Sequence, residues 1–157
     1  MLKRCSPYFF VFYARYYLSL VLAGMLSTHL CAFAEEPQAL TDTDRSAIRT
    51  VIQSQLDAFQ ADDAALAFSY ASPAIQAQFG NPQNFMAMVK SGYQPVYRPR
   101  SVLFGDAVEI QGKIAQQVLI MDAEGKSVMA IYPMEKQADG SWRIAGCYLA
   151  PSRAQML

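Results

Sequence analysis

The chain has 157 residues, with 13 Lys and Arg, 13 Asp and Glu, and one histidine. This length is typical of a single domain. The balanced charge leaves no basic surplus and argues against a nucleic-acid-binding protein, because affinity for nucleic acids comes largely from neutralising phosphates.

The first 34 residues have the pattern of a cleavable secretory signal. Lys3 and Arg4 form a basic start, an uncharged apolar run covers residues 16–26, and Ala32-Phe33-Ala34 supplies a small-residue cleavage site. We therefore expect residues 1–34 to be a signal peptide cleaved after Ala34, and the mature protein to be periplasmic or secreted.

The alternative is an uncleaved membrane anchor. A membrane-spanning helix needs about 20 uninterrupted apolar residues, and Arg15 interrupts this segment. A lipid attached to Cys31 is a weaker alternative, because the bulky Leu30 precedes it. Contact with a membrane is therefore expected only if the signal is retained.

Removal of the signal changes the chemistry that remains. Residues 35–157 have 10 Lys and Arg against 13 Asp and Glu, retain only Cys147 of the three cysteines, and lose His29, the only histidine. An internal disulfide, a Ser-His-Asp or Cys-His catalytic unit and a histidine-ligated zinc site are then excluded. Any catalytic base would be Asp, Glu, Lys or Tyr, and no cofactor or metal is expected.

Helical patterns fill the first half of the mature chain. After a flexible tail over residues 35–40, Thr41 and Asp44 have the spacing of a helix cap. Ser72-Pro73 and Asn81-Pro82 each place a capping residue before a proline at the first helical position. We expect helices from Thr41 to about Gln60, from Ala64 to Tyr70, from Ser72 to Phe79, and from Asn81 to Gly92.

The pattern then changes to strands. Pro95 and Pro99 predict extended backbone over residues 93–100, and Asp139-Gly140 predicts a hairpin turn. Gly105 indicates a bulge, and Pro133 indicates a bulge or a sheet edge. The strands expected are Ser101–Ile110, Lys113–Asp122, Lys126–Gln137 and Ser141–Leu149.

Helices followed by antiparallel strands predict an α+β fold, with the helices packed on a sheet of four or more strands. The domain is expected to cover residues 41–152, with a short tail at 153–157. The second and third strands are apolar on both faces, whereas a sheet that faces water normally has one polar face. We therefore expect the second face to be covered, and a homodimer through the sheet is one way to cover it.

Several segments together resemble a known family. They are Ala58-Phe59 with Asp62-Asp63, residues 68–79 (FSYASPAIQAQF), Gly92-Tyr93 with residues 95–100 (PVYRPR), and residues 139–144 (DGSWRI) with Gly146-Cys147. The stretch that contains them, residues 52–149, resembles an uncharacterised family of exported bacterial proteins, the domain of unknown function 4864 family. The family brings no assigned reaction.

The order of helices and strands, with the DGSWRI ending, is also similar to the nuclear transport factor 2-like superfamily. This second resemblance implies a cone, in which helices close one side of a curved sheet around a blind apolar pocket. Cones of this kind serve isomerases, dehydratases, hydrolases and binding modules, so the fold alone does not choose a function.

Arg98 and Arg100 are the leading candidates for a binding site. In an extended segment their side chains would point to one side, beside Tyr93 and Tyr97, and could bind a carboxylate or phosphate. A solvated or Asp-paired edge is the structural alternative. If the pair binds an anion, replacing both arginines by alanine should abolish binding and leave folding intact.

Other residues are weaker candidates. Tyr70 and Tyr132 could line a pocket, although tyrosines also fill cores with the hydroxyl at the edge. Either Gln116 or its neighbour should face inward and could bond a ligand. Cys147 is expected to be an inert core residue, and Asp57, opposite the apolar face of the long helix, is expected to be solvated.

Three functions remain open from the sequence. The first is a non-catalytic periplasmic binding module that holds a small apolar or weakly anionic ligand. The second is a cone-fold enzyme, such as an isomerase or dehydratase, that uses Tyr with a strand-borne acid such as Asp106 or Glu109. The third is a structural homodimer with a filled cone. An acidic residue pointing into a cavity would favour the enzyme, and a filled interior would favour the third.

Overall fold

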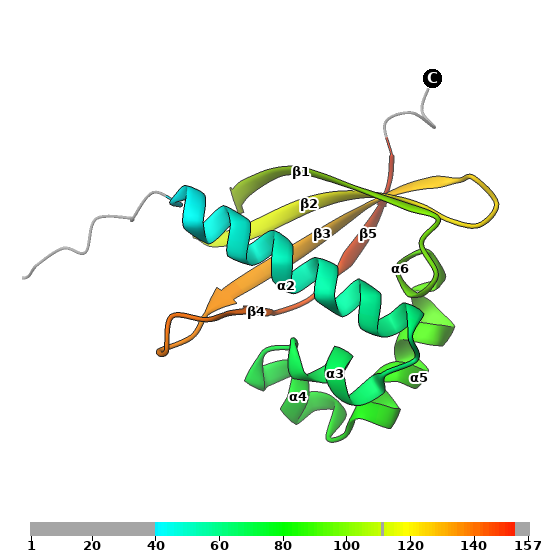
Figure 1. Cartoon of the computed structure of the whole chain (residues 1–157), viewed down its shortest axis with the longest axis horizontal. Helices are drawn as coiled ribbons and strands as arrows, with labels where there is room; N and C mark the ends of the chain where they lie inside the picture. The colour runs from blue at the N-terminus through cyan, green and yellow to red at the C-terminus, as the bar shows by residue number, and fades with distance from the viewer. Residues whose placement is uncertain (1–39, 111, 153–157) are drawn as a thin grey trace, which may run out of the picture. The chain divides into compact units, whose positions relative to one another are not determined.

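The computed structural model describes residues 40–110 and 112–152, which form helices followed by a curved antiparallel sheet (Figure 1). The α+β prediction is confirmed. The predicted signal peptide, most of the tail at 35–40 and the tail at 153–157 lie outside the described residues. The helices are α2 Asp42–Gln60, α3 Ala64–Ser69, α4 Pro73–Phe79, α5 Pro82–Gly92 and α6 Gln94–Tyr97. The strands are β1 Ser101–Ile110, β2 Lys113–Met121, β3 Ser127–Lys136, β4 Trp142–Ile144 and β5 Tyr148–Pro151.

Helices α2, α4 and α5 begin at the capping residues predicted from the sequence, and α3 begins after Asp63. The Thr41 hydroxyl accepts the Asp44 backbone N–H at 3.1 Å, and the Asp44 carboxylate accepts from Thr41 in return. The side chains of Asp63, Ser72 and Asn81 each accept a backbone N–H three residues later. Each cap satisfies an amide that the first helical turn leaves unbonded.

The segment before the sheet differs from the prediction of extended backbone. It contains the short helix α6, with Pro95 in the first turn, where a proline sacrifices no helical hydrogen bond. The chain leaves the helix at Arg98, whose φ is −133° and ψ is 67°. The prolines therefore bound a helical turn rather than a strand.

The fourth position in the sheet is shared by two strands. Both β4 and β5 pair antiparallel with β3, and Ala145–Cys147 bulge out between them. The predicted single strand over residues 141–149 is wrong in this respect. Opposite the bulge, Pro133 has no N–H to donate, and its carbonyl accepts the Ala145 N–H at 2.8 Å. The predicted bulge or edge at Pro133 thus takes the form of a bulge in the neighbouring chain, between β4 and β5, and not in the strand that contains the proline.

A second predicted bulge is confirmed in β1. The register with β2 shifts between Phe104 and Ala107, at Gly105. The Gly105 carbonyl accepts the amide N–H of the fully buried Gln116 at 2.8 Å. Gln116 also donates to the Gln117 carbonyl at 2.9 Å, so its side chain stabilises the bulge from the inner face.

The connection between α3 and α4 is hydrogen-bonded to the far side of β4. The Ile144 N–H donates to the Tyr70 carbonyl at 2.9 Å, and the Ser72 N–H donates to the Ile144 carbonyl at 2.8 Å. Ala71, between them, forms a parallel bridge with Ile144. The helical layer and the sheet are therefore joined by backbone bonds at this edge.

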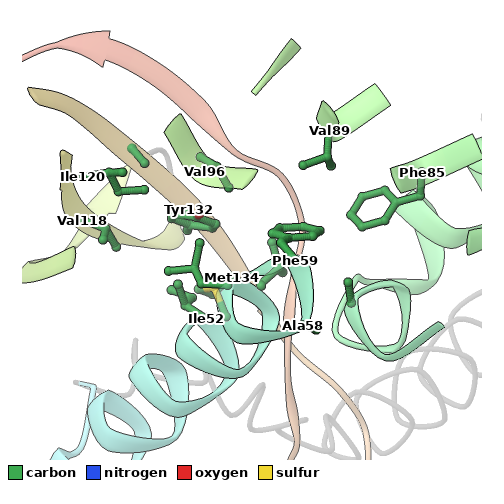
Figure 2. Packing of buried hydrophobic residues seen from close by; sticks show 14 of the residues in the cluster. Ile52, Ala58, Phe59, Phe85, Val89, Val96, Val118, Ile120, Tyr132 and Met134 are labelled. Atoms are coloured by element: carbon green, nitrogen blue, oxygen red, sulfur yellow. The ribbon is translucent and has the colours of Figure 1, made fainter. Parts of the chain in front are cut away.

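The core lies between the apolar face of α2 and the inner face of the sheet, as Figure 2 shows for Ile52, Val118 and Ile120. Burial of each such side chain contributes about 1.5–3 kcal/mol to folding. The apolar residues at helical spacing in this part of the sequence are Ile48, Val51, Ile52, Leu56 and Phe59. The structure buries four of them, and Val51 is partly buried.

The outer face of the sheet is also partly apolar. Leu103 and Tyr148 are 66% and 64% exposed, and they share this face with the half-buried side chains of Leu119, Met129 and Ile131. The apolar pattern on both faces, read from the sequence, is therefore present in the folded sheet.

The β3–β4 hairpin is anchored to the start of α2 through Asp44. The Asp44 carboxylate accepts the Trp142 indole N–H at 3.0 Å and pairs with the Lys136 ammonium at 2.9 Å. Hydrogen bonds from Lys136, then Thr41 and Trp142, hold the pKa of Asp44 well below its usual range. One carboxylate therefore caps the helix and fixes the hairpin.

Candidate ligand-binding cavity

A cavity of about 550 Å³ lies between the helices and the end of the sheet where β4 gives way to β5. This volume is within the range of small-molecule sites. Its helical wall is formed by Gln55, Phe59, Ala71, Ile75, Gln78, Phe79, Phe85, Met88, Val89, Tyr93 and Val96. Its sheet wall is formed by Tyr132 and by residues 144–148.

Aromatic rings form much of the helical wall. The Phe85 ring lies 6.0 Å from the Phe59 ring and 5.5 Å from the Phe79 ring, between centroids, and the second pair meets edge to face. Rings in these arrangements attract one another and hold the wall in place. The asparagine-proline start of α5 aims Phe85 at this cluster, because it fixes where the helix begins.

The bulge between β4 and β5 supplies the opposite wall. Ala145, Gly146 and Cys147 are displaced from the regular ladder and face the cavity. The Tyr93 hydroxyl donates to the Cys147 carbonyl at 3.1 Å, which ties the end of α5 to the bulge. Burial raises the pKa of Tyr93, so this hydroxyl stays protonated as a donor at neutral pH.

Tyr132 and Cys147 meet at the buried end of the cavity. Tyr132 is 1% exposed, and desolvation raises its pKa well above the ordinary value. Desolvation also raises the pKa of the Cys147 thiol to about 12. At neutral pH the thiol is therefore almost entirely protonated, which favours the inert interpretation of this cysteine over a reactive one.

The cavity is uncharged. Among the described residues that line it, none is Asp, Glu, Lys or Arg. Asp106 and Glu109, the acids considered for catalysis, are exposed on β1, and Asp57 is exposed on α2, where it accepts from Gln53 at 2.8 Å. The lining thus offers uncharged hydrogen-bonding groups and no candidate base of the carboxylate type.

Two further observations concern only the part of the chain that the structure describes. Over residues 40–110 and 112–152, no group of three or more His, Cys, Asp or Glu is placed to hold a metal ion. Within the same ranges, no helix is both long enough and apolar enough to cross a membrane.

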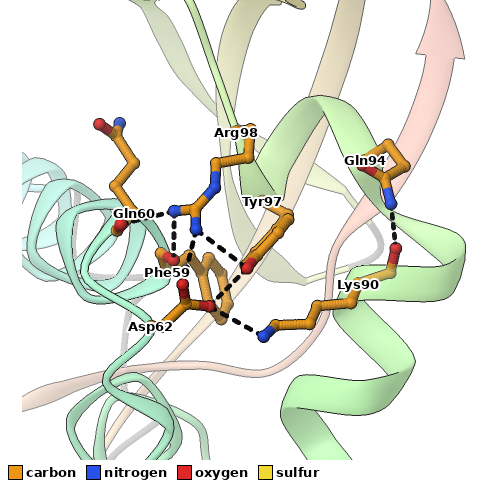
Figure 3. A network of polar contacts seen from close by, with 7 residues as sticks. All are labelled: Phe59, Gln60, Asp62, Lys90, Gln94, Tyr97 and Arg98. Atoms are coloured by element: carbon orange, nitrogen blue, oxygen red, sulfur yellow. Dashed lines mark hydrogen bonds and ion pairs between the residues drawn. The ribbon is translucent and has the colours of Figure 1, made fainter.

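Arg98 lies outside the cavity, in a polar cluster at the end of α2 (Figure 3). Its guanidinium donates to the Phe59 carbonyl at 3.0 Å and also to the Gln60 carbonyl. It pairs with the Asp62 carboxylate at 2.7 Å. Arg98 therefore binds the negative end of helix α2 and a carboxylate of the same chain. This is the Asp-paired arrangement that the sequence left open as the alternative to a ligand site.

Asp62 also contacts the other side chains of this cluster. It sits at the α2–α3 corner with φ of 57°, accepts from the Tyr97 hydroxyl, and pairs with Lys90 at 2.9 Å. The hydrogen bond from Tyr97, followed by that from Lys90, lowers the pKa of Asp62 below its usual range. Tyr97 also lies against both cations, with the Arg98 guanidinium carbon 4.3 Å and the Lys90 nitrogen 5.2 Å from its ring centroid.

The remaining predicted site residues are dispersed. Arg100 is exposed beside a shallow depression that it shares with Arg98. Tyr70 ends α3 and packs against the core, and Gln116 supports the β1 bulge. Of the seven candidates, the structure brings only Tyr93 and Tyr132 together at the cavity.

Gln55 and Tyr148 are two of the cavity residues that the sequence did not identify as site candidates. Gln55 is buried on the apolar face of α2 and donates to the Ala67 carbonyl at 3.0 Å. Its position in the sequence, on the same helical face as Ile52, Leu56 and Phe59, could have indicated a buried amide. Such an amide needs a hydrogen-bond partner, because unpaired polar groups are rarely buried. Tyr148 had no such signal, since its place at the cavity depends on the bulge.

This fold and site define the class of protein. It is a small α+β domain with a neutral, largely apolar cavity between its helices and a curved sheet. The pattern of the family described as "Domain of unknown function (DUF4864)" matches residues 41–157. The chain therefore belongs to the domain of unknown function 4864 family. Searches of the curated proteins and of the solved structures gave no significant match.

Proposed function

We propose that this protein is an exported, non-catalytic binding module that holds a small apolar ligand in the cavity. The observation that carries the proposal is the lining, which is apolar and aromatic with a few uncharged polar groups. Binding sites for small molecules typically have this composition. Export is supported by the signal pattern of residues 1–34, and the third alternative, a filled cone, does not explain a cavity of about 550 Å³.

The test is binding of a fluorescent apolar probe, N-phenyl-1-naphthylamine, to protein produced from the full-length reading frame. We expect saturable fluorescence enhancement, and we expect Met88→Trp to weaken probe binding roughly tenfold or more, because the larger ring occupies space in the cavity. Met88 is half-buried on α5, so the new ring can enter the cavity without displacing the core.

Ala87→Trp is the matched control, because Ala87 is exposed on the same helix. It should bind the probe as the unaltered protein does, and circular dichroism should show both variants folded. Absence of saturable binding by the unaltered protein, or equal binding by folded Met88→Trp, would contradict the proposed function.

We infer that the cone belongs to the nuclear transport factor 2-like superfamily. Two features support this placement: the helices precede a curved antiparallel sheet, and the DGSWRI segment supplies the turn and second strand of the β3–β4 hairpin. The binding proposal rests on the cavity lining and does not depend on the superfamily.

We also propose that two copies associate through the outer face of the sheet. The apolar patch of Leu103, Leu119, Met129, Ile131 and Tyr148 is uncharged, so two identical patches can meet across a two-fold axis without like-charge repulsion. Burial of this patch would remove exposed apolar area from water.

Light scattering at micromolar concentration should then report a dimer. Leu103→Lys should shift the protein to a monomer, because it places a charge within the apolar contact. Leu66→Lys is the control, since Leu66 is 44% exposed on α3, away from the sheet. A monomeric unaltered protein, or a dimer that persists in Leu103→Lys, would overturn the proposal.

A further inference from the structure

One hydroxyl in the cavity wall, that of Tyr132, has only a weak sulfur neighbour, the Cys147 thiol. The Tyr132 hydroxyl is buried, and it makes no hydrogen bond of normal geometry with any of the residues that the structure describes. Leaving a buried hydroxyl unpaired costs about 1–3 kcal/mol, and such groups are rare in folded proteins. A hydroxyl held at this cost needs an explanation.

The Tyr132 hydroxyl interacts with the Cys147 thiol, and both residues line the cavity. A thiol is only a weak hydrogen-bonding group, so the hydroxyl keeps its capacity to donate. The Tyr93 hydroxyl, also in the lining, already donates to the Cys147 carbonyl, so of these two hydroxyls the one without an oxygen acceptor is that of Tyr132.

The surroundings of the hydroxyl set the charge of what it can bind. No Lys or Arg is among the described residues of the lining, and a carboxylate or phosphate buried without a cation is strongly disfavoured. The cations Lys90 and Arg98 lie outside the lining and are paired with Asp62. The lining therefore selects against an anion and in favour of a neutral oxygen acceptor.

We propose that the Tyr132 hydroxyl donates a hydrogen bond to a carbonyl, ether or hydroxyl oxygen of an uncharged ligand whose apolar body fills the cavity. This inference rests on the proposed binding function and specifies its ligand class. The aromatic wall of Phe59, Phe79 and Phe85 contacts the apolar body, and the tyrosine fixes its orientation.

Three probes of similar size test the proposal by displacement of N-phenyl-1-naphthylamine. They are 1-tetralone, a neutral ketone; tetralin, which lacks the oxygen; and 1-naphthoate, an anion. The unaltered protein should bind 1-tetralone most tightly. Tyr132→Phe should weaken binding of 1-tetralone roughly three- to tenfold, the value of one neutral hydrogen bond, and leave tetralin binding unchanged.

The outcomes separate this inference from the function on which it rests. If no probe binds, the binding function itself fails. If 1-tetralone and tetralin bind alike, before and after Tyr132→Phe, a cavity exists but the hydroxyl does not recognise oxygen. Preferred binding of 1-naphthoate would overturn the neutral ligand class. Urea unfolding completes the test: Tyr132→Phe should be at least as stable as the unaltered protein, and a clear loss of stability would mean that the hydroxyl has an internal partner.

Discussion

Trp142→Ala should lower the free energy of unfolding by about 3–5 kcal/mol, the usual cost of removing a large buried aromatic side chain. Trp142 is 7% exposed and packs in the core cluster. Its indole N–H also donates to Asp44 at 3.0 Å, and Lys136 lies over its ring at 5.6 Å. Domains of this size have total stabilities of about 5–15 kcal/mol, so the variant should lose a large part of its stability.

Trp142→Phe separates the two contributions. Phenylalanine keeps a buried aromatic ring but cannot donate to Asp44, so it should cost less than alanine. The measurement is urea unfolding followed by circular dichroism, with the midpoint and slope fitted for both variants. A loss below about 1 kcal/mol for Trp142→Ala, typical of surface positions, would show that the hairpin does not depend on this contact.

Local features of the fold could be predicted because their causes are local. Thr41 with Asp44, and Asn81 before Pro82, are caps whose chemistry acts within one turn. Pro133 could be assigned to a bulge because it lacks an N–H, whatever its neighbours are. Even so, the division of the last strand into β4 and β5 required knowing which strand lies beside Pro133.

The cavity could be predicted only in outline, because its walls come from distant parts of the chain. Phe85 and Tyr132 are 47 positions apart in the sequence, and they share the cavity through the packing of α5 against the end of the sheet. The spacing of Phe85, Met88 and Val89 in the sequence is typical of an apolar helical face, but spacing cannot show that the face borders a cavity. Tyr148 reaches the same cavity only because a bulge displaces the chain before it.

The arginine pair shows a related limit of reasoning from spacing. Two residues apart in an extended strand, Arg98 and Arg100 would share a side and act together. The segment before Arg98 is the short helix α6 and not an extended strand, so the two side chains are not held to one side. The partners of Arg98 are 36 to 39 positions away in the sequence, at the end of α2. The anion that Arg98 binds is the protein's own Asp62 carboxylate, whereas the sequence suggested an external ligand.

Arg98→Ala should therefore lower the free energy of unfolding by about 1–2 kcal/mol. A charged hydrogen bond contributes about 1.5–3 kcal/mol, and the Arg98 side chain is 42% exposed, so solvent screening reduces that value. Arg100→Ala is the matched control, because the Arg100 side chain is exposed and lies outside the α2 contact. It should change stability by less than about 0.5 kcal/mol.

Urea unfolding at neutral pH measures both arginine variants. The two changes remove the same charge from neighbouring positions, so a difference between them isolates the bonds to the carbonyls of Phe59 and Gln60 and to Asp62 from a general effect of net charge. Equal stability of the two variants would mean that the contact at the end of α2 contributes nothing to the free energy of unfolding. Arg98 and Arg100 would then again be candidates for solvated side chains that a ligand can reach. The structure gives the opposite expectation, because a helix that ends with its last carbonyls bonded to a guanidinium loses those partners when the guanidinium is removed.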